Sequence, residues 1–159
     1  MNGEQLRKKT RDGGIVYGTM LSVGTNPRWT QTISQFGLDY IILDTEHAPR
    51  SRAEVADYLT AFNYSGVVPI VRIPIPASHY VTMYIDAGAQ GILAPYCETV
   101  DQVREVVAAA RWRPLKGALA AKAVEENVLP SKATREYLED KNKNNVCIIV
   151  QHVFELLRA

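Results

Sequence analysis

The sequence predicts an α/β protein built from successive strand–helix units around a parallel sheet. Apolar runs of strand length alternate with segments of helical periodicity along the chain. The run at 39–44 (DYIILD) is apolar on both faces, which is typical of a parallel strand that is covered on both sides. Strands and helices that alternate at this spacing form right-handed βαβ units, so one parallel sheet is expected.

The first strand is expected at 15–23 (IVYGTMLSV), where the apolar run passes into a loop. Asn26 and Pro27 then provide an N-cap and a proline at the first helical position. The helix that they start should run to about residue 36, and Gly37 should end it.

The second strand, 39–44, precedes a helix that Ser51 begins, because Ser51 and Glu54 have the spacing of a capping box. Apolar residues at helical spacing follow, which gives this helix one buried stripe. The third strand is expected at 67–73 (VVPIVRI), and prolines close it at positions 74 and 76.

A helix at 78–87 should end at Gly88, before a fourth strand at 90–96 (QGILAPY) and an amphipathic helix at 99–110. The segment 111–145 is less regular, although its charged stretch after Pro130 and Ser131 has a helical pattern. A fifth strand is expected at 146–151 (VCIIVQ).

Two layouts fit this order: an open doubly wound sheet and a (β/α)8 barrel of the TIM type. The sequence contains neither GxGxxG after its first strand nor GxxxxGK[ST], whereas polar residues recur at strand ends, which favours the barrel. A full barrel has eight strands and about 250 residues. We therefore expect residues 1–159 to form a single partial barrel domain of about five βα units. A fragment, a sheet completed by a partner and an open sheet all remain possible layouts.

The composition excludes several classes of function. The chain has 159 residues and a net charge of +1, so it lacks the basic field that attracts nucleic acid or an anionic membrane. A small molecule or a second copy of the chain is the expected partner. Cys97 and Cys147 have no metal-ligand spacing, and the polar residues 1–12 lack a signal peptide's apolar region. These features predict a cytoplasmic protein with reduced thiols.

The densest polar cluster, Asp44, Glu46 and His47, directly follows the second strand. Parallel α/β proteins build their sites at such strand ends. His47 can act as a general acid or base near neutral pH, and Asp44 lies close enough in sequence to orient it. A polar turn with a hydrogen-bonded histidine is the structural alternative.

Arg72 interrupts the apolar third strand, where a charge needs a partner. Its guanidinium can bind a carboxylate or an enolate through two hydrogen bonds, or it can form a structural ion pair with Asp44 or Asp86. Asp86 can support Arg72 or His47, or it can simply belong to a helix end.

Three motifs follow one another in the chain: LDTEHAP (43–49), PIVRIP (69–74) and DAGAQGILAPYCET (86–99). Together with VREVVAAARWRP (103–114), they resemble the HpcH/HpaI aldolase family, which is also called the citrate lyase-like or pyruvate class II aldolases. The resemblance covers about residues 18–151. The segment 113–146 is more similar to the fungal branch that includes macrophomate synthase than to the bacterial aldolases.

The resemblance implies a (β/α)8 barrel in a homo-oligomer and a carbon–carbon lyase that acts on a 2-keto acid. Retro-aldol cleavage or decarboxylation would pass through a pyruvate enolate. The expected partner is a small keto acid or aldehyde, and the expected cofactor is a divalent ion, Mg²⁺, Mn²⁺ or Co²⁺. His47 matches the acid/base, Asp44 its orienting carboxylate, Arg72 the enolate-stabilising and substrate-binding arginine, and Asp86 a supporting acid. Gln151 matches a substrate-binding position.

The sequence departs from the family pattern at the metal. The fifth strand of the family ends in a motif like VQIE, and the position of its metal-binding glutamate holds Val153 here. The second metal carboxylate belongs to the next strand, which would follow Ala159. We therefore expect no metal ligand in this chain, and the alternative function is an inactive truncated homologue that serves as a binding or scaffold protein.

Overall fold

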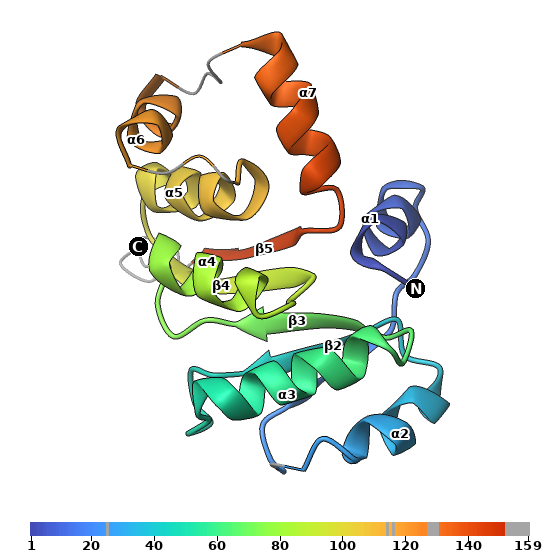
Figure 1. The fold of residues 1–159 in the computed structure, drawn as a ribbon. Helices are drawn as coiled ribbons and strands as arrows, with labels where there is room; N and C mark the ends of the chain where they lie inside the picture. Colours follow the sequence, from blue (N-terminus) through green and yellow to red (C-terminus); the bar gives the residue numbers. More distant parts are fainter. Residues whose placement is uncertain (25, 114, 116, 127–130, 152–159) are drawn as a thin grey trace, which may run out of the picture.

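The computed structural model describes residues 1–159 except 25, 114, 116, 127–130 and 152–159. Its centre is a five-stranded parallel sheet whose strands follow one another in sequence order (Figure 1). The strands are β1 (Gly18–Leu21), β2 (Tyr40–Asp44), β3 (Val68–Arg72), β4 (Gly91–Cys97) and β5 (Val146–Gln151). A doubly wound sheet reverses its strand order at a switch point, so this order fits the wall of a barrel instead.

Seven α-helices and a 3₁₀ helix are found in the described part of the chain. They are α1 (Gly3–Arg11), α2 (Trp29–Ile33), the 3₁₀ helix η1 (Ser34–Phe36), α3 (Arg52–Asn63), α4 (Ser78–Asp86), α5 (Val100–Arg111), α6 (Gly117–Glu126) and α7 (Lys132–Lys141). None of these helices is long and apolar enough to cross a membrane.

The two faces of the sheet are covered differently. The outer face packs against α3, α4 and α5, which lie side by side along the sheet (Figure 1), and together they bury the larger core. The inner face packs against α1 through Leu6 and forms a second core with Ile42, Val68, Ile70 and Val146. A single layer of helices outside the strands is the arrangement of a barrel wall.

The expected strands are all present, and their bounds differ from the expected ones by no more than three residues. The capping box of Ser51 and Glu54 forms, and Gly37 ends η1 in the left-handed conformation at φ 68°. The first strand is shorter than expected, because β1 pairs with β2 over four residues only. The sequence pattern did not predict α1, whose own capping box joins Asn2 and Gln5, or α6.

The register of the strands decides where the polar residues lie. Ile42 pairs with Ile70, and two residues further Asp44 pairs with Arg72. Because alternate residues of a strand share a face, Asp44 and Arg72 continue the inner face that Ile42 and Ile70 begin. Both are the last residues of their strands, so they meet at the carboxyl edge of the sheet.

Candidate active site

Asp44 and Arg72 form a buried, two-point ion pair at the carboxyl edge. The guanidinium donates from Nε to Oδ1 at 2.9 Å and from Nη2 to Oδ2 at 2.6 Å. The side chain of Asp44 is 1% exposed and that of Arg72 is 17% exposed. Burial by itself raises the pKa of Asp44, but hydrogen bonds from Arg72 and from two backbone N–H groups outweigh it and lower the pKa below its usual value. Its bond to Asp44 in turn raises the pKa of Arg72.

The turn after β2 is built around the same carboxylate. Oδ1 of Asp44 accepts the backbone N–H of Glu46 at 2.9 Å and that of His47 at 3.2 Å. Thr45 ties the turn to β3, because its backbone N–H and its hydroxyl both donate to the carbonyl of Arg72, at 3.1 and 2.6 Å. The sequence therefore fixes this turn by local hydrogen bonds as well as by the sheet.

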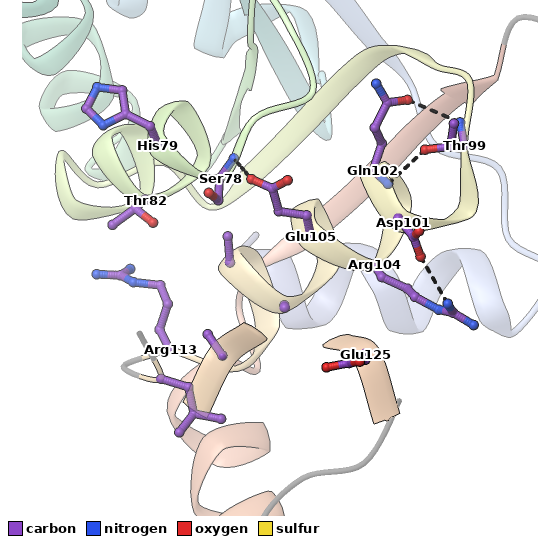
Figure 2. Close-up of a pocket in the computed structure, with 14 residues that line it drawn as sticks. Ser78, His79, Thr82, Thr99, Asp101, Gln102, Arg104, Glu105, Arg113 and Glu125 are labelled. Carbon is purple, nitrogen blue, oxygen red and sulfur yellow. Dashed lines mark hydrogen bonds and ion pairs between the residues drawn. The ribbon is translucent and has the colours of Figure 1, made fainter. Parts of the chain in front are cut away.

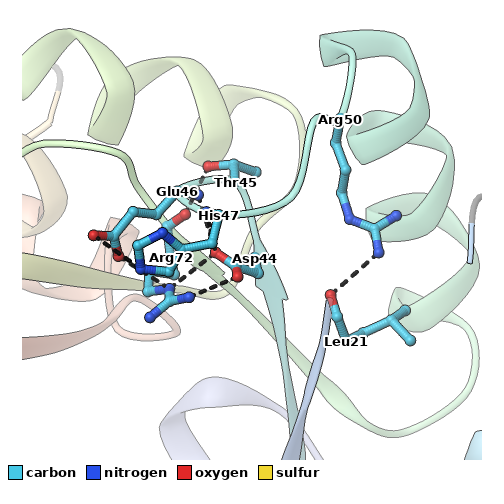
Figure 3. A network of polar contacts seen from close by, with 7 residues as sticks. All are labelled: Leu21, Asp44, Thr45, Glu46, His47, Arg50 and Arg72. Carbon is cyan, nitrogen blue, oxygen red and sulfur yellow. Dashed lines mark hydrogen bonds and ion pairs between the residues drawn. The ribbon is translucent and has the colours of Figure 1, made fainter. Parts of the chain in front are cut away.

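Glu46 contacts both the guanidinium and the imidazole (Figure 3). Its Oε2 is 3.3 Å from Nε of Arg72 and its Oε1 is 3.4 Å from Nε2 of His47. The carboxylate side chain is 8% exposed, whereas the imidazole is 62% exposed. The expected contact between Asp44 and His47 forms through the backbone N–H of His47, and Glu46 is the carboxylate that faces the imidazole. The reason is that Arg72 and two backbone N–H groups already occupy Asp44.

Asp86 does not join this cluster within one chain and belongs to a helix end, the second of the two roles that its sequence position allowed. It is the last residue of α4, is exposed, and pairs with Arg113. A helix between two parallel strands runs back to their amino edge, and the backbone N–H of Gln90, just beyond α4, donates to the carbonyl of Pro69 near the start of β3. Asp86 therefore lies at the edge opposite Arg72, where it cannot orient that guanidinium within one chain.

Gln151 is the last residue of β5 and pairs in register with Cys97 of β4. This places its backbone at the same carboxyl edge as Asp44 and Arg72. Its expected contact with substrate stays a prediction.

Arg50 and Tyr96 also belong to this edge, although the sequence analysis did not single them out. Arg50 donates to the carbonyls of Gly24 at 2.6 Å and Leu21 at 3.2 Å, which fixes the loop after β1 beside the cluster (Figure 3). These carbonyls lie more than twenty positions earlier in the chain, so no local pattern signals the contact. The pKa of Tyr96 is raised, chiefly by its interaction with the Glu46 carboxylate.

A separate cavity of about 880 Å³ lies in the outer helical layer, lined by α4, α5 and α6 (Figure 2). Glu105 of α5 points toward Ser78 there and accepts its backbone N–H at 2.9 Å. This bond gives an acceptor to one of the N–H groups in the first turn of α4 that have no partner within the helix. None of Asp44, Glu46, His47 and Arg72 lines this cavity, so it is distinct from the polar cluster.

A divalent ion, which the sequence resemblance implies, does not fit the side chains that the structure describes. Within that part of the chain, no group of three or more His, Cys, Asp and Glu side chains could hold a metal ion. The carboxylates of Asp44 and Glu46 both face Arg72 instead. Val153, which occupies the family's glutamate position, lies outside the described residues. No side chain in the described part of the chain is therefore assigned as a metal ligand.

Comparison with known proteins gives a consistent picture. A hydroxypyruvate/pyruvate aldolase from Roseobacter denitrificans is 30% identical over 109 residues, which cover 69% of this chain and 42% of that protein. A 5-keto-4-deoxy-D-glucarate aldolase from Escherichia coli is 28% identical over 127 residues, or 80% of this chain and 48% of that protein. The chain spans about half the length of the curated relatives that it matches.

Solved structures show the same fold. An HpcH/HpaI aldolase from Desulfitobacterium hafniense superposes with a TM-score of 0.74 at 26% identity and covers 96% of this chain and 59% of its own. Macrophomate synthase superposes with a TM-score of 0.64 at 23% identity over 94% of this chain and 52% of its own, which shows a common fold. The family model of HpcH/HpaI aldolase/citrate lyase matches residues 19–151. The chain therefore belongs to the HpcH/HpaI aldolase/citrate lyase family.

Proposed function

We propose that this protein is a carbon–carbon lyase that acts on a 2-keto acid, by retro-aldol cleavage or decarboxylation through a pyruvate enolate. One observation carries the proposal: a guanidinium held by two carboxylates lies beside an exposed imidazole at the carboxyl edge of the sheet. Enzymes of the barrel fold build their sites at this edge. Two relatives are named as a hydroxypyruvate/pyruvate aldolase and a 5-keto-4-deoxy-D-glucarate aldolase, and these names support the same chemistry.

Arg72 is proposed to bind the keto acid and to stabilise the enolate. Asp44 bonds to Nε and Nη2, so the guanidinium is fixed in orientation while Nη1 carries no bond to Asp44. A donor that is already in place when negative charge develops on the enolate oxygen stabilises that charge without having to reorganise. The side chain is also partly exposed, so a substrate can reach it.

His47 is proposed to move the proton. In retro-aldol cleavage its imidazole accepts the proton of the substrate hydroxyl, and the carbon–carbon bond then breaks to give an aldehyde and the pyruvate enolate. A proton returned to C3 of the enolate completes the reaction and releases pyruvate. The contact with Glu46 restricts the imidazole on one side, while most of its surface stays open to substrate.

The remaining expectations have different support. The comparisons give no support to the alternative of an inactive scaffold, since the relatives quoted above are named aldolases. The divalent ion that the family resemblance implies, assembly into a homo-oligomer and a cytoplasmic location stay predictions.

Exchange of the pyruvate methyl protons for deuterium tests enolate formation directly, by proton NMR in D₂O with and without added Mg²⁺ or Mn²⁺. The assay needs no second substrate. We expect exchange above the buffer rate, and we expect His47→Gln to lower it by about 100-fold or more, the usual contribution of a general acid or base. Arg72→Lys should also reduce the rate, because lysine cannot reproduce the fixed fork of donors.

His79→Gln is the matched control, because His79 is exposed on α4 outside the cluster. It should exchange pyruvate protons at the wild-type rate. Exchange no faster than buffer in the wild type, or equal rates in the wild type and His47→Gln, would reject the proposed function.

A further inference from the structure

The end of β4 contains one extra residue, which changes the face on which Tyr96 lies. Ala94 pairs with Ile149, and Cys97 pairs with Gln151, so three steps along β4 match two steps along β5. This is the pattern of a β-bulge. Ala94 and Cys97 are both buried in the outer core. The bulge therefore gives the outer-face position to Cys97 and leaves Tyr96 for the inner face.

The backbone of Tyr96 is in a costly conformation. Its φ is 54°, in the left-handed region, and it is the only non-glycine residue with positive φ in the described part of the chain. A tyrosine keeps such a conformation only where the surrounding structure imposes it, and such residues are concentrated at functional sites. Bulges likewise occur next to active sites, where they redirect a side chain.

The redirected side chain reaches the polar cluster. The pKa of Tyr96 is raised, chiefly by its interaction with the Glu46 carboxylate, with burial adding to the effect. Glu46 is the carboxylate that faces both His47 and Arg72. Three adjacent strands, β2, β3 and β4, thus each send a group to one place at the carboxyl edge.

We propose that Tyr96 is a positioning residue that acts through Glu46, because its hydroxyl holds the carboxylate between the imidazole of His47 and the guanidinium of Arg72. The consequence for activity rests on the proposed function given above. Without the hydroxyl, the carboxylate is free to turn toward the guanidinium alone, and the imidazole loses the group that restricts it. The substrate does not need to touch Tyr96 for this effect.

The contact itself can be tested without any activity. Tyrosine labelled with ¹³C at Cζ gives one NMR signal for each tyrosine, and the Tyr96 signal is the one missing from Tyr96→Phe. In Glu46→Gln, the titration midpoint of that signal should fall toward the ordinary tyrosine value of about 10. The signal of Tyr64, which is exposed, should not move. A Tyr96 midpoint that is unchanged in Glu46→Gln would overturn the proposal.

The positioning role can be tested by the same pyruvate exchange assay. We expect Tyr96→Phe to lower kcat about tenfold with little change in KM, as befits the loss of one hydrogen bond away from the substrate. Tyr64→Phe should match the wild type. Because Tyr96 acts only through the carboxylate of Glu46, the double variant Tyr96→Phe/Glu46→Gln should be no slower than Glu46→Gln alone.

The outcomes separate the two proposals. Wild-type activity in Tyr96→Phe, or rate losses that multiply in the double variant, would reject the positioning role. Absence of exchange in the wild type would reject the proposed function, and the tyrosine titration would then still decide whether Tyr96 holds Glu46. Circular dichroism of each variant checks that the fold is kept.

Discussion

Replacing Asp44 by asparagine should destabilise the protein by about 3 kcal/mol, because it removes one charge of a buried ion pair. Breaking such a pair costs about 3–5 kcal/mol, and the lower end applies here for two reasons. Arg72 keeps Glu46 as a second partner at 3.3 Å, and its side chain is 17% exposed. The asparagine oxygen can still accept the backbone N–H groups of the turn, so those bonds do not add to the loss.

Urea denaturation at pH 7, followed by circular dichroism, measures this cost. With a slope of about 1–3 kcal/mol/M, the midpoint should fall by about 1–3 M. Asp101→Asn is the matched control, because Asp101 pairs with Arg104 on the surface and its side chain is 85% exposed. Exposed pairs contribute about 0–1 kcal/mol. A loss below about 1 kcal/mol in Asp44→Asn would show that solvent screens the Asp44–Arg72 pair and would refute the reasoning.

Three further predictions follow from the structure. The folded-state pKa of Asp44 is lowered, so the stabilisation that its charge provides is fully present above the unfolded pKa of about 3.9. This stabilisation is lost as the pH falls through the folded pKa. Between pH 5 and pH 2, the free energy of unfolding should therefore decline less in Asp44→Asn than in the wild type. Burial raises the pKa of Cys97 and raises that of Cys147 to about 11. Both thiols should therefore react slowly with a thiol reagent at pH 8 in the native protein and quickly in urea. Fast labelling of the native protein would contradict this prediction. A Cβ added at Gly3 would overlap the backbone carbonyl of Asn144, so Gly3→Ala should displace α1 and increase hydrogen exchange in its amides, and unchanged protection would disprove the close packing.

The core of the site was predictable because its signals are local. Asp44 and Arg72 each end an apolar strand, and parallel strands end at the same edge, so their meeting follows from the order of the strands. The capping box of Ser51 and Glu54 was equally visible, because both of its bonds span three residues. The helix α6 was not predicted, since the preceding segment shows no clear start signal.

Of the two roles that the sequence left open for Asp86, the structure shows the helix end, and the reason is topological. Its motif resembles the family pattern, but the motif does not say to which edge of the sheet the residue belongs. The return of α4 between two parallel strands takes it to the amino edge, where it pairs with Arg113. Sequence proximity to the fourth strand therefore gave no information about distance from Arg72.

By itself, the sequence determined the order of the strands, the resemblance to an aldolase family and the arginine that lies in an apolar strand, because each of these depends on residue type and short spacing. Only the tertiary structure decided that Glu46 rather than Asp44 faces His47, and that Cys97 rather than Tyr96 follows Ala94 into the outer core. Both depend on how one strand pairs with the next. A single extra residue in β4 changes the face of a side chain, and that register is set between strands that lie far apart in the chain.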